Sequence, residues 1–186
     1  MSNGVSAISP WQRKAWEVQF RTVCLLMRDD MMNAVLRERL SALRSRLDDF
    51  DMYLGPAVRS QDLVTLNAAA RDWFGAEIPR GYAEFLRTHD GFVAAGVFLY
   101  SSRARPFPDS EGHSPAFLEQ NRIAREVDCM NNVLVFGDSD QDYYVLDLSS
   151  KTYQVRDRQA FDNVYEEYST FDEMLAHVIT VVEQLS

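Results

Sequence analysis

The sequence predicts an α+β fold: a mainly antiparallel sheet of about four to six strands with helices packed on it, and an N-terminal helical extension. Three observations lead to this prediction. Apolar residues recur at helical spacing through the first half of the chain. After residue 132 the pattern becomes that of short strands, joined by polar turns too short for parallel crossovers. The last segment is helical again.

The chain has 186 residues, of which 46% are hydrophobic and 25% are charged, as is usual for one globular domain with its own core. We therefore expect a single domain over residues 1–186. Its first part is the helical extension, residues 10–55, which ends at Gly55-Pro56. The core occupies residues 60–186.

Two helices are expected at the start of the core. The first begins at Ser60, carries an apolar stripe from Leu63 to Phe74, and stops at Gly75. The second lies in IPRGYAEFLRTHDGF, residues 78–92, where Pro79 suits the first turn and Gly91 can adopt a left-handed cap.

Strands follow. VFLY at 97–100 predicts a strand, and 102–115 predicts a loop. Ser114-Pro115 then opens a helix that runs to about Glu126. Four strands are expected in VLVFG, YYVLDL, KTYQVR and NVYEEY. The final helix begins with a capping box formed by Thr170 and Glu173.

The net charge of −9 is unevenly spread. Residues 59–186 carry 11 Lys or Arg against 21 Asp or Glu. Such a surface repels phosphate backbones, which argues against direct nucleic-acid binding, and it would attract a basic protein. The alternative is that the acidity only keeps the protein soluble.

Other composition features predict a cytoplasmic protein. No apolar run approaches the roughly 18 residues of a membrane span. The first sixteen residues lack the apolar core of a secretory signal. Cys24 and Cys129 are too far apart for a CxxC pair and are expected to be free thiols.

The segment GDSDQDYY places Asp138, Asp140 and Asp142 at alternate positions, as in the first half of an EF-hand calcium loop. The second half does not match, because Tyr143 replaces the required glycine and Ser149 the required glutamate. A hairpin turn is favoured instead, since Asp and Ser side chains bond nearby backbone N–H groups. At such a turn these carboxylates would be solvated, with ordinary pKa values. We therefore predict no catalytic residue, metal site or cofactor, with an enzyme built on this turn as an alternative.

The histidines give no metal-ligand pattern. His89 is expected to pack at the edge of the core, and His177, off the apolar stripe of its helix, is expected to be exposed.

Three segments together resemble the SUKH superfamily, the group that includes the yeast cell-wall-synthesis regulator and many bacterial toxin-immunity proteins. The matching positions are Ile78, Pro79, Tyr82, Phe85, Leu86, Asp90 and Gly91 in the first segment, Val135, Phe136, Gly137, Asp142, Tyr144 and Asp147 in the second, and Phe171, Glu173, Met174 and Leu175 in the third. The resemblance covers about residues 60–186. The long N-terminal segment is similar to that of the YrhA-like subgroup. The chain departs from the family at Phe92, which stands directly after Asp90-Gly91 where the family has a second glycine.

The resemblance implies a non-catalytic immunity protein that neutralises a cognate bacterial toxin by protein–protein occlusion. Such toxins are often delivered by contact-dependent or type VI secretion. The acidity predicts that this toxin is basic, for example a nuclease or another enzyme that targets nucleic acids or nucleotides. The alternative is a regulatory scaffold that binds an endogenous protein.

Eight residues are candidates for partner binding. They are Asp138, Asp140, Asp142 and Tyr143 in the turn, Asp109 and Glu111 in the 102–115 loop, and the pair Glu166 and Glu167. Tyr144 alternates with Tyr143 and should point into the core.

Overall fold

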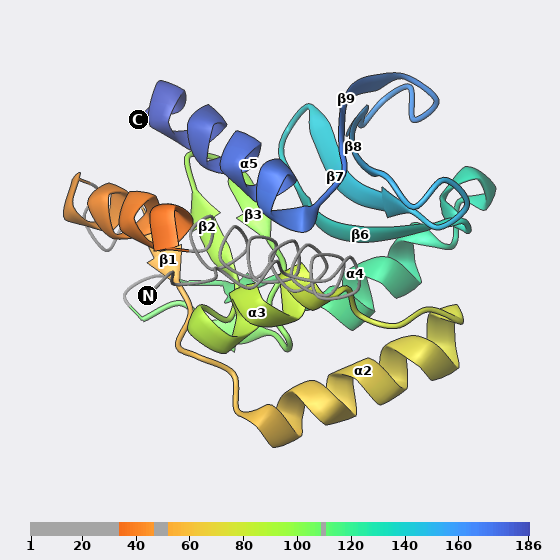
Figure 1. Ribbon diagram of the computed structural model, residues 1–186, viewed down its shortest axis with the longest axis horizontal. Coiled ribbons are helices and arrows are strands. Elements are labelled where there is room, and N and C mark those ends of the chain that lie inside the picture. Colours follow the sequence, from red (N-terminus) through yellow and green to blue (C-terminus); the bar gives the residue numbers. More distant parts are fainter. Residues whose placement is uncertain (1–33, 47–51, 109–110) are drawn as a thin grey trace, which may run out of the picture. The chain divides into compact units, whose positions relative to one another are not determined.

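The computed structural model describes residues 34–46, 52–108 and 111–186 (Figure 1). The chain divides into two units at Glu38 and Arg39, and the unit from Arg39 onward carries the fold described below. Most of the extension expected over residues 10–55 lies outside the described residues. Within it, residues 34–46 are helical, with Leu40 and Leu43 buried. The single-domain organisation stays a prediction.

The main element is a seven-stranded antiparallel sheet in the order β1-β2-β3-β6-β7-β8-β9. Its strands are β1 (Met52–Leu54), β2 (Phe92–Ala94), β3 (Val97–Leu99), β6 (Val133–Asp138), β7 (Asp142–Asp147), β8 (Tyr153–Asp157) and β9 (Val164–Tyr168). A separate two-stranded sheet pairs β4 (Arg105–Pro106) with β5 (His113–Ser114). The predicted fold class is confirmed. The main sheet has one strand more than the expected range because β1 and β2, with three residues each, are too short to show a period.

Four helices and one 3₁₀ turn complete the described part of the core. They are α2 (Ser60–Phe74), α3 (Arg80–Thr88), α4 (Phe117–Ala124), η1 (Asp128–Met130) and α5 (Phe171–Leu185). Gly75 ends α2 in the left-handed conformation, with φ of 66°. Thr170 and Glu173 form the predicted capping box of α5.

Helix α4 starts later than the sequence predicts. Ser114 is part of β5, where its hydroxyl accepts a hydrogen bond from the backbone N–H of Arg105 (3.2 Å), so it cannot act as the N-cap. Ala116 occupies the N-cap position instead and gives no side-chain cap. Pairing with a strand nine residues away outweighs the local capping preference.

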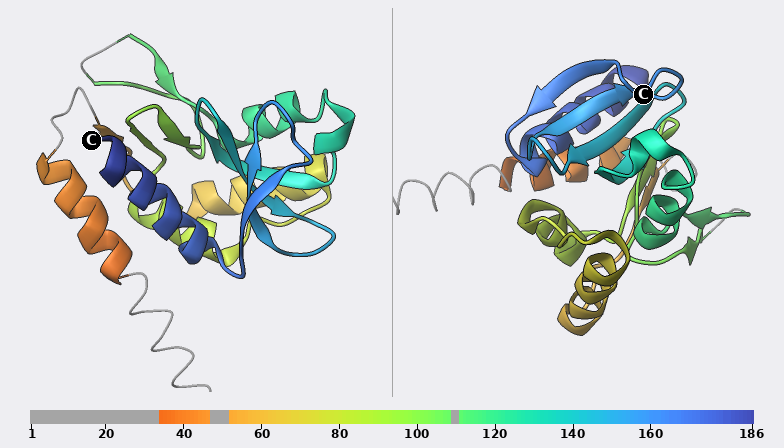
Figure 2. Two further views of the ribbon diagram at one scale, coloured as in Figure 1. Left: turned by 90° about the horizontal axis from the view of Figure 1, so that it is seen from above. Right: turned by 90° about the vertical axis from the view of Figure 1, so that its right-hand side faces the viewer.

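Helices α3, α4 and α5 pack on the sheet (Figures 1 and 2). The core between these helices and the sheet is an aromatic cluster. The Phe136 ring of β6 lies 4.9 Å from Tyr82 of α3, 5.9 Å from Phe117 of α4 and 5.5 Å from Phe171 of α5. All four side chains are fully or almost fully buried. The Tyr82 hydroxyl donates to the carbonyl of Tyr100 (2.7 Å), which satisfies its polar end. Three helices are thereby fixed to one strand.

Two glycines allow backbones to approach closely. A Cβ at Gly137 would lie 2.1 Å from the carbonyl oxygen of Phe98, so only glycine permits β6 to pack on β3 there. Gly91 has a φ of 88°, and a Cβ there would lie 2.1 Å from the side-chain oxygen of Ser101. Gly91 follows the end of α3 rather than capping it directly, because His89 is the C-cap residue.

The residue before this glycine, Asp90, is fully buried. Its carboxylate accepts hydrogen bonds from the backbone N–H and the hydroxyl of Ser102 and from the guanidinium of Arg105. Its own N–H donates to the carbonyls of Gly55 and Pro56. Asp90 therefore joins the segment after β1 to the segment after β3.

Within the part of the chain that the structure describes, no helix combines the length and apolarity needed to cross a membrane.

Candidate functional site

The predicted partner-binding residues fall on three parts of the structure. Asp138 ends β6, Asp140 lies in the turn, and Asp142 and Tyr143 begin β7, so these residues form a hairpin as expected. Glu166 and Glu167 lie on β9, at one end of the sheet order.

The loop residues do not join this group. Glu111 is exposed in the connection between β4 and β5, and Figure 2 shows that small hairpin away from β7, β8 and β9. Asp109 lies outside the described residues.

The turn is closed by its own serine. The Ser139 N–H donates to the carbonyl of Asp142 (2.9 Å), and the Ser139 hydroxyl accepts from the N–H groups of Gln141 (3.2 Å) and Asp142 (3.0 Å). This is the hydrogen bonding expected of a Ser/Asp turn.

A residue from another loop clamps the same turn. The Arg158 guanidinium donates to the carbonyl of Ser139 (2.7 Å) and lies 3.3 Å from the carboxylate of Asp138, while its backbone N–H donates to the carbonyl of Gln141 (2.8 Å). Three contacts from one residue hold the turn in a single conformation.

The expectation that the turn carboxylates are solvated is wrong for Asp138. Its side chain is only 16% exposed. Burial raises its pKa, and the nearby Arg158 charge and a hydrogen bond with Tyr100 partly oppose that rise. Burial also raises the pKa of Asp142, whereas Asp140 is exposed as expected. The hairpin is short, but the β8–β9 loop covers it, and a local sequence pattern does not reveal that cover.

Tyr143 lies in a cluster of aromatic and arginine side chains. Its ring meets Phe161 edge to face at 6.0 Å, and the Arg158 guanidinium lies 5.5 Å from its centroid. Arg156 in turn lies 4.7 Å from the Phe161 ring. Tyr143 is therefore half-buried and held in place. Tyr144 points to the other face and is fully buried, which confirms the alternation.

A second carboxylate, which the sequence analysis missed, stands opposite Asp142. Asp157 pairs with Asp142 across β7 and β8. The Tyr165 hydroxyl donates to Asp157 (2.6 Å), and this bond, with the N–H groups of Gln159 and Ala160, holds the pKa of Asp157 below its usual value. Like charges directly opposite each other on adjacent strands are unfavourable, and a cation placed between them would relieve the repulsion.

Glu166 and Glu167 stand on opposite faces of β9. Glu167 pairs with Gln154, on the face that carries Arg156, and Glu166 pairs with Val155 on the helix-covered face. Both are exposed. Together with Asp138, Asp140, Asp142 and Asp157 they place carboxylates on the four successive strands β6 to β9 and the β6–β7 turn, on both faces of the sheet. We call these six residues the acidic rim.

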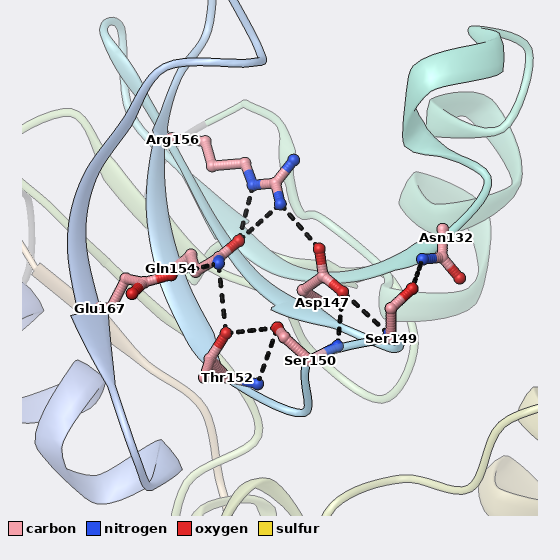
Figure 3. A network of polar contacts seen from close by, with 8 residues as sticks. All are labelled: Asn132, Asp147, Ser149, Ser150, Thr152, Gln154, Arg156 and Glu167. Atoms are coloured by element: carbon pink, nitrogen blue, oxygen red, sulfur yellow. Dashed lines mark hydrogen bonds and ion pairs between the residues drawn. The ribbon is translucent and has the colours of Figure 1, made fainter.

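A polar network at the β7–β8 turn includes one residue of the rim, Glu167 (Figure 3). Gln154 donates to Glu167 (2.7 Å) and accepts two hydrogen bonds from Arg156 (2.6 and 2.8 Å), and Arg156 also donates to Asp147 (2.9 Å). Burial alone would raise the pKa of Asp147, but hydrogen bonds from the N–H groups of Ser150 and Ser149 and from Arg156 lower it. The network fixes the β7–β8 turn and the orientation of Glu167.

The surface beside the rim includes exposed apolar side chains. Tyr165 is 56% exposed and Val164 is 39% exposed, both on β9. Apolar groups next to carboxylates on a rigid strand are suited to a protein contact.

The histidines lie apart from one another. His89 is half-buried, as expected at the edge of the core, and its ring lies 6.2 Å from Phe85. His177 is also half-buried, against Tyr168 at 5.7 Å, so the expectation that it is exposed is wrong. Tyr168 comes from β9, and the sequence of α5 alone gives no sign of that contact.

Among the described residues, no group of three or more His, Cys, Asp or Glu side chains is placed to hold a metal ion.

Comparison with family models gives a match to the SMI1 / KNR4 family (SUKH-1) over residues 63–177, which is more than half of the chain. The chain belongs to this family. No curated protein matches it. The YrhA-like subgroup stays a prediction.

The SUKH motif residues lie mainly in the core and its turns, and only Asp142 also belongs to the rim. Tyr82, Phe136 and Phe171 make the aromatic core, and Gly137 allows β3 and β6 to pack closely. Asp147 organises the β7–β8 turn. The motifs therefore account for a shared fold, while most of the acidic rim lies at positions that they leave open.

Proposed function

We propose that this protein is a cytoplasmic, non-catalytic immunity protein that neutralises a cognate bacterial toxin by binding it through the acidic rim. The SUKH family is associated with toxin immunity. The observation that carries the proposal is a group of six carboxylates, held on adjacent strands and a clamped turn, beside exposed Tyr165 and Val164.

Rigidity supports this role. Arg158 fixes the β6–β7 turn, and the network around Arg156 fixes Glu167. A surface that is already ordered loses little conformational entropy when a partner binds. The toxin surface it covers would be basic, because lysine and arginine side chains neutralise the repulsion between carboxylates such as Asp142 and Asp157.

Two kinds of contact would have separate effects. The carboxylates accelerate association with a basic toxin by long-range attraction, in a salt-dependent way. Burial of the Tyr165 ring and Val164 slows dissociation. The toxin is then blocked by coverage of its functional surface, with no bond made or broken. A nuclease or another enzyme that acts on nucleic acids or nucleotides has the basic surface required, and type VI or contact-dependent secretion is the delivery route to examine.

The test is co-expression with the product of the adjacent toxin gene. Wild-type protein should restore growth and co-elute with the toxin in gel filtration. The double variant Asp140→Lys/Glu166→Lys changes only exposed side chains and should weaken binding by about tenfold or more, chiefly through the association rate. The control, Glu119→Lys/Glu126→Lys, makes the same charge change on exposed residues in and just after α4, none of which belongs to the rim, and should bind like wild type.

Failure to rescue growth, or equal weakening by both double variants, would refute the proposal. Recovery of an endogenous protein in place of a secreted toxin would favour a regulatory scaffold.

A further inference from the structure

A groove lies between α2 and α3, on elements that contribute nothing to the acidic rim. It is open to solvent and has a volume of about 490 Å³. Apolar side chains line it, among them Leu63, Val64, Ile78 and Ala83. Val64 is 62% exposed, which is unusual for a valine in the middle of a helix.

The groove follows from the arrangement of the two helices. The Ile78 N–H donates to the side chain of Asn67 (2.8 Å), which holds the short connection against α2. At the other end, the Val58 N–H donates to the carbonyl of Leu86 (2.9 Å). The start of α2 therefore lies beside the end of α3, and the two helices run as a hairpin with the groove between them.

The charge of the groove is opposite to that of the chain. Arg71, Arg80 and Arg87 line it, and no Asp or Glu does, although the net charge of the protein is −9. Arg71 and Arg80 lie at the closed end, near the connection, and Arg87 lies toward the other end.

These arginines are open to a new partner. Arg71 pairs with Glu77 and Arg80 with Glu84, each at 2.6 Å, but the two arginine side chains are 58% and 72% exposed. Water screens such surface pairs, so carboxylates of a partner can replace or extend them. Arg87 is exposed and forms no ion pair with any residue that the structure describes.

We propose that this groove binds an acidic amphipathic helix of a partner protein. Its apolar side chains pack on Val64 and the groove floor, and its carboxylates reach the arginines at the two ends. Arg80 and Arg87 are seven residues apart on α3, which corresponds to about 10 Å along the axis. A helix with carboxylates at positions i and i+7 and apolar residues between them has the same spacing.

The chemistry favours a protein segment over a nucleic acid. The arginines can pair with phosphates as well as with carboxylates, but the apolar side chains between them favour a partner with apolar side chains, and the overall negative charge of the protein repels a phosphate backbone. The ligand is also distinct from the basic toxin of the proposed function, because a basic surface would be repelled by the three arginines. The inference therefore stands whether or not the rim binds a toxin.

The test uses a labelled, alanine-based helical peptide with Glu at positions i and i+7 and Leu at i+3 and i+4. Fluorescence anisotropy with the full chain should show saturable binding. A peptide with Lys in place of both Glu residues should bind about tenfold or more weakly, because its charges oppose those of the groove. The variant Arg80→Gln/Arg87→Gln should lose a similar factor, and Val64→Lys should also weaken binding.

The matched control is Arg122→Gln, which removes an exposed arginine of α4 outside the groove and should leave the affinity unchanged. Thermal unfolding of each variant shows that it is folded. The absence of saturable binding, equal binding of the Glu and Lys peptides, or an unchanged affinity in the double variant would overturn the inference. A duplex oligonucleotide that binds more tightly than the Glu peptide, and is lost in the double variant, would overturn it in favour of nucleic acid.

Discussion

The replacement Asn121→Ala should cost this protein a large part of its stability. Asn121 lies on α4 and is fully buried. Its side-chain amide behaves as an extra strand partner: Nδ2 donates to the carbonyl of Val135 (2.7 Å), and Oδ1 accepts from the N–H of Val135 (2.8 Å). Val135 borders the register shift in the pairing of β6 with β7. The amide therefore satisfies the backbone at the point where the sheet is irregular.

The size of this stability loss follows from the two backbone groups of Val135 that would lose their hydrogen-bond partner. Alanine would leave one buried N–H and one buried C=O without their partner, and each such group costs about 1–3 kcal/mol. The expected loss in the free energy of unfolding is therefore about 2–6 kcal/mol. Since small domains have only about 5–15 kcal/mol in total, the change should be obvious.

Urea denaturation monitored by circular dichroism measures this loss. The matched control is Asn131→Ala, which removes the same side chain at an exposed position and should change stability by no more than about 0.5 kcal/mol. A loss below about 1 kcal/mol for Asn121→Ala, with an unchanged slope of the denaturation curve, would refute the assignment of the amide as the partner of β6.

Three further predictions concern the rim and the polar network beside it. Arg158→Ala removes the two side-chain contacts that Arg158 makes with the β6–β7 turn; we expect weaker toxin binding because the turn is no longer held in place, and a growth-rescue and binding assay in which Arg158→Ala equals wild type would contradict this. The pKa of Asp147 is lowered in the folded state, so its contribution to stability is present above the unfolded value of about 3.9 and is lost as pH falls below it. Denaturation midpoints should therefore fall more steeply between about pH 5 and pH 2 for wild type than for Asp147→Asn, and parallel curves would count against the shift. Finally, millimolar calcium or manganese should leave the melting temperature unchanged, whereas a rise that disappears in Asp138→Asn would support the alternative of a metal-dependent enzyme.

The sequence alone determined the type and order of most core elements. Residue spacing reports the face that an element buries, so the stripe of α5, the stripe of α2 as far as Ala70, and the alternation of Tyr143 and Tyr144 were predicted correctly. The stripe fails at the end of α2, where Trp73 is 56% exposed. The capping box of α5 and the hairpin at Asp138–Asp142 were also correct, because both depend on residues close together in the chain. The three-residue strands β1 and β2 were missed, whereas β3, of the same length, was predicted from the apolar run VFLY.

The tertiary structure decided which residues work together. Arg158 contacts Asp138 from twenty residues further along the chain. The sequence predicted a solvated turn, but this contact leaves the Asp138 carboxylate largely buried. Asp157 stands opposite Asp142 because of the register of β7 and β8, and Glu166 and Glu167, neighbours in sequence, point to opposite faces of β9. The groove exists only where α2 and α3 pack side by side. Periodicity and charge are local properties that a sequence displays directly, whereas strand register and helix pairing depend on the free energy of the whole fold.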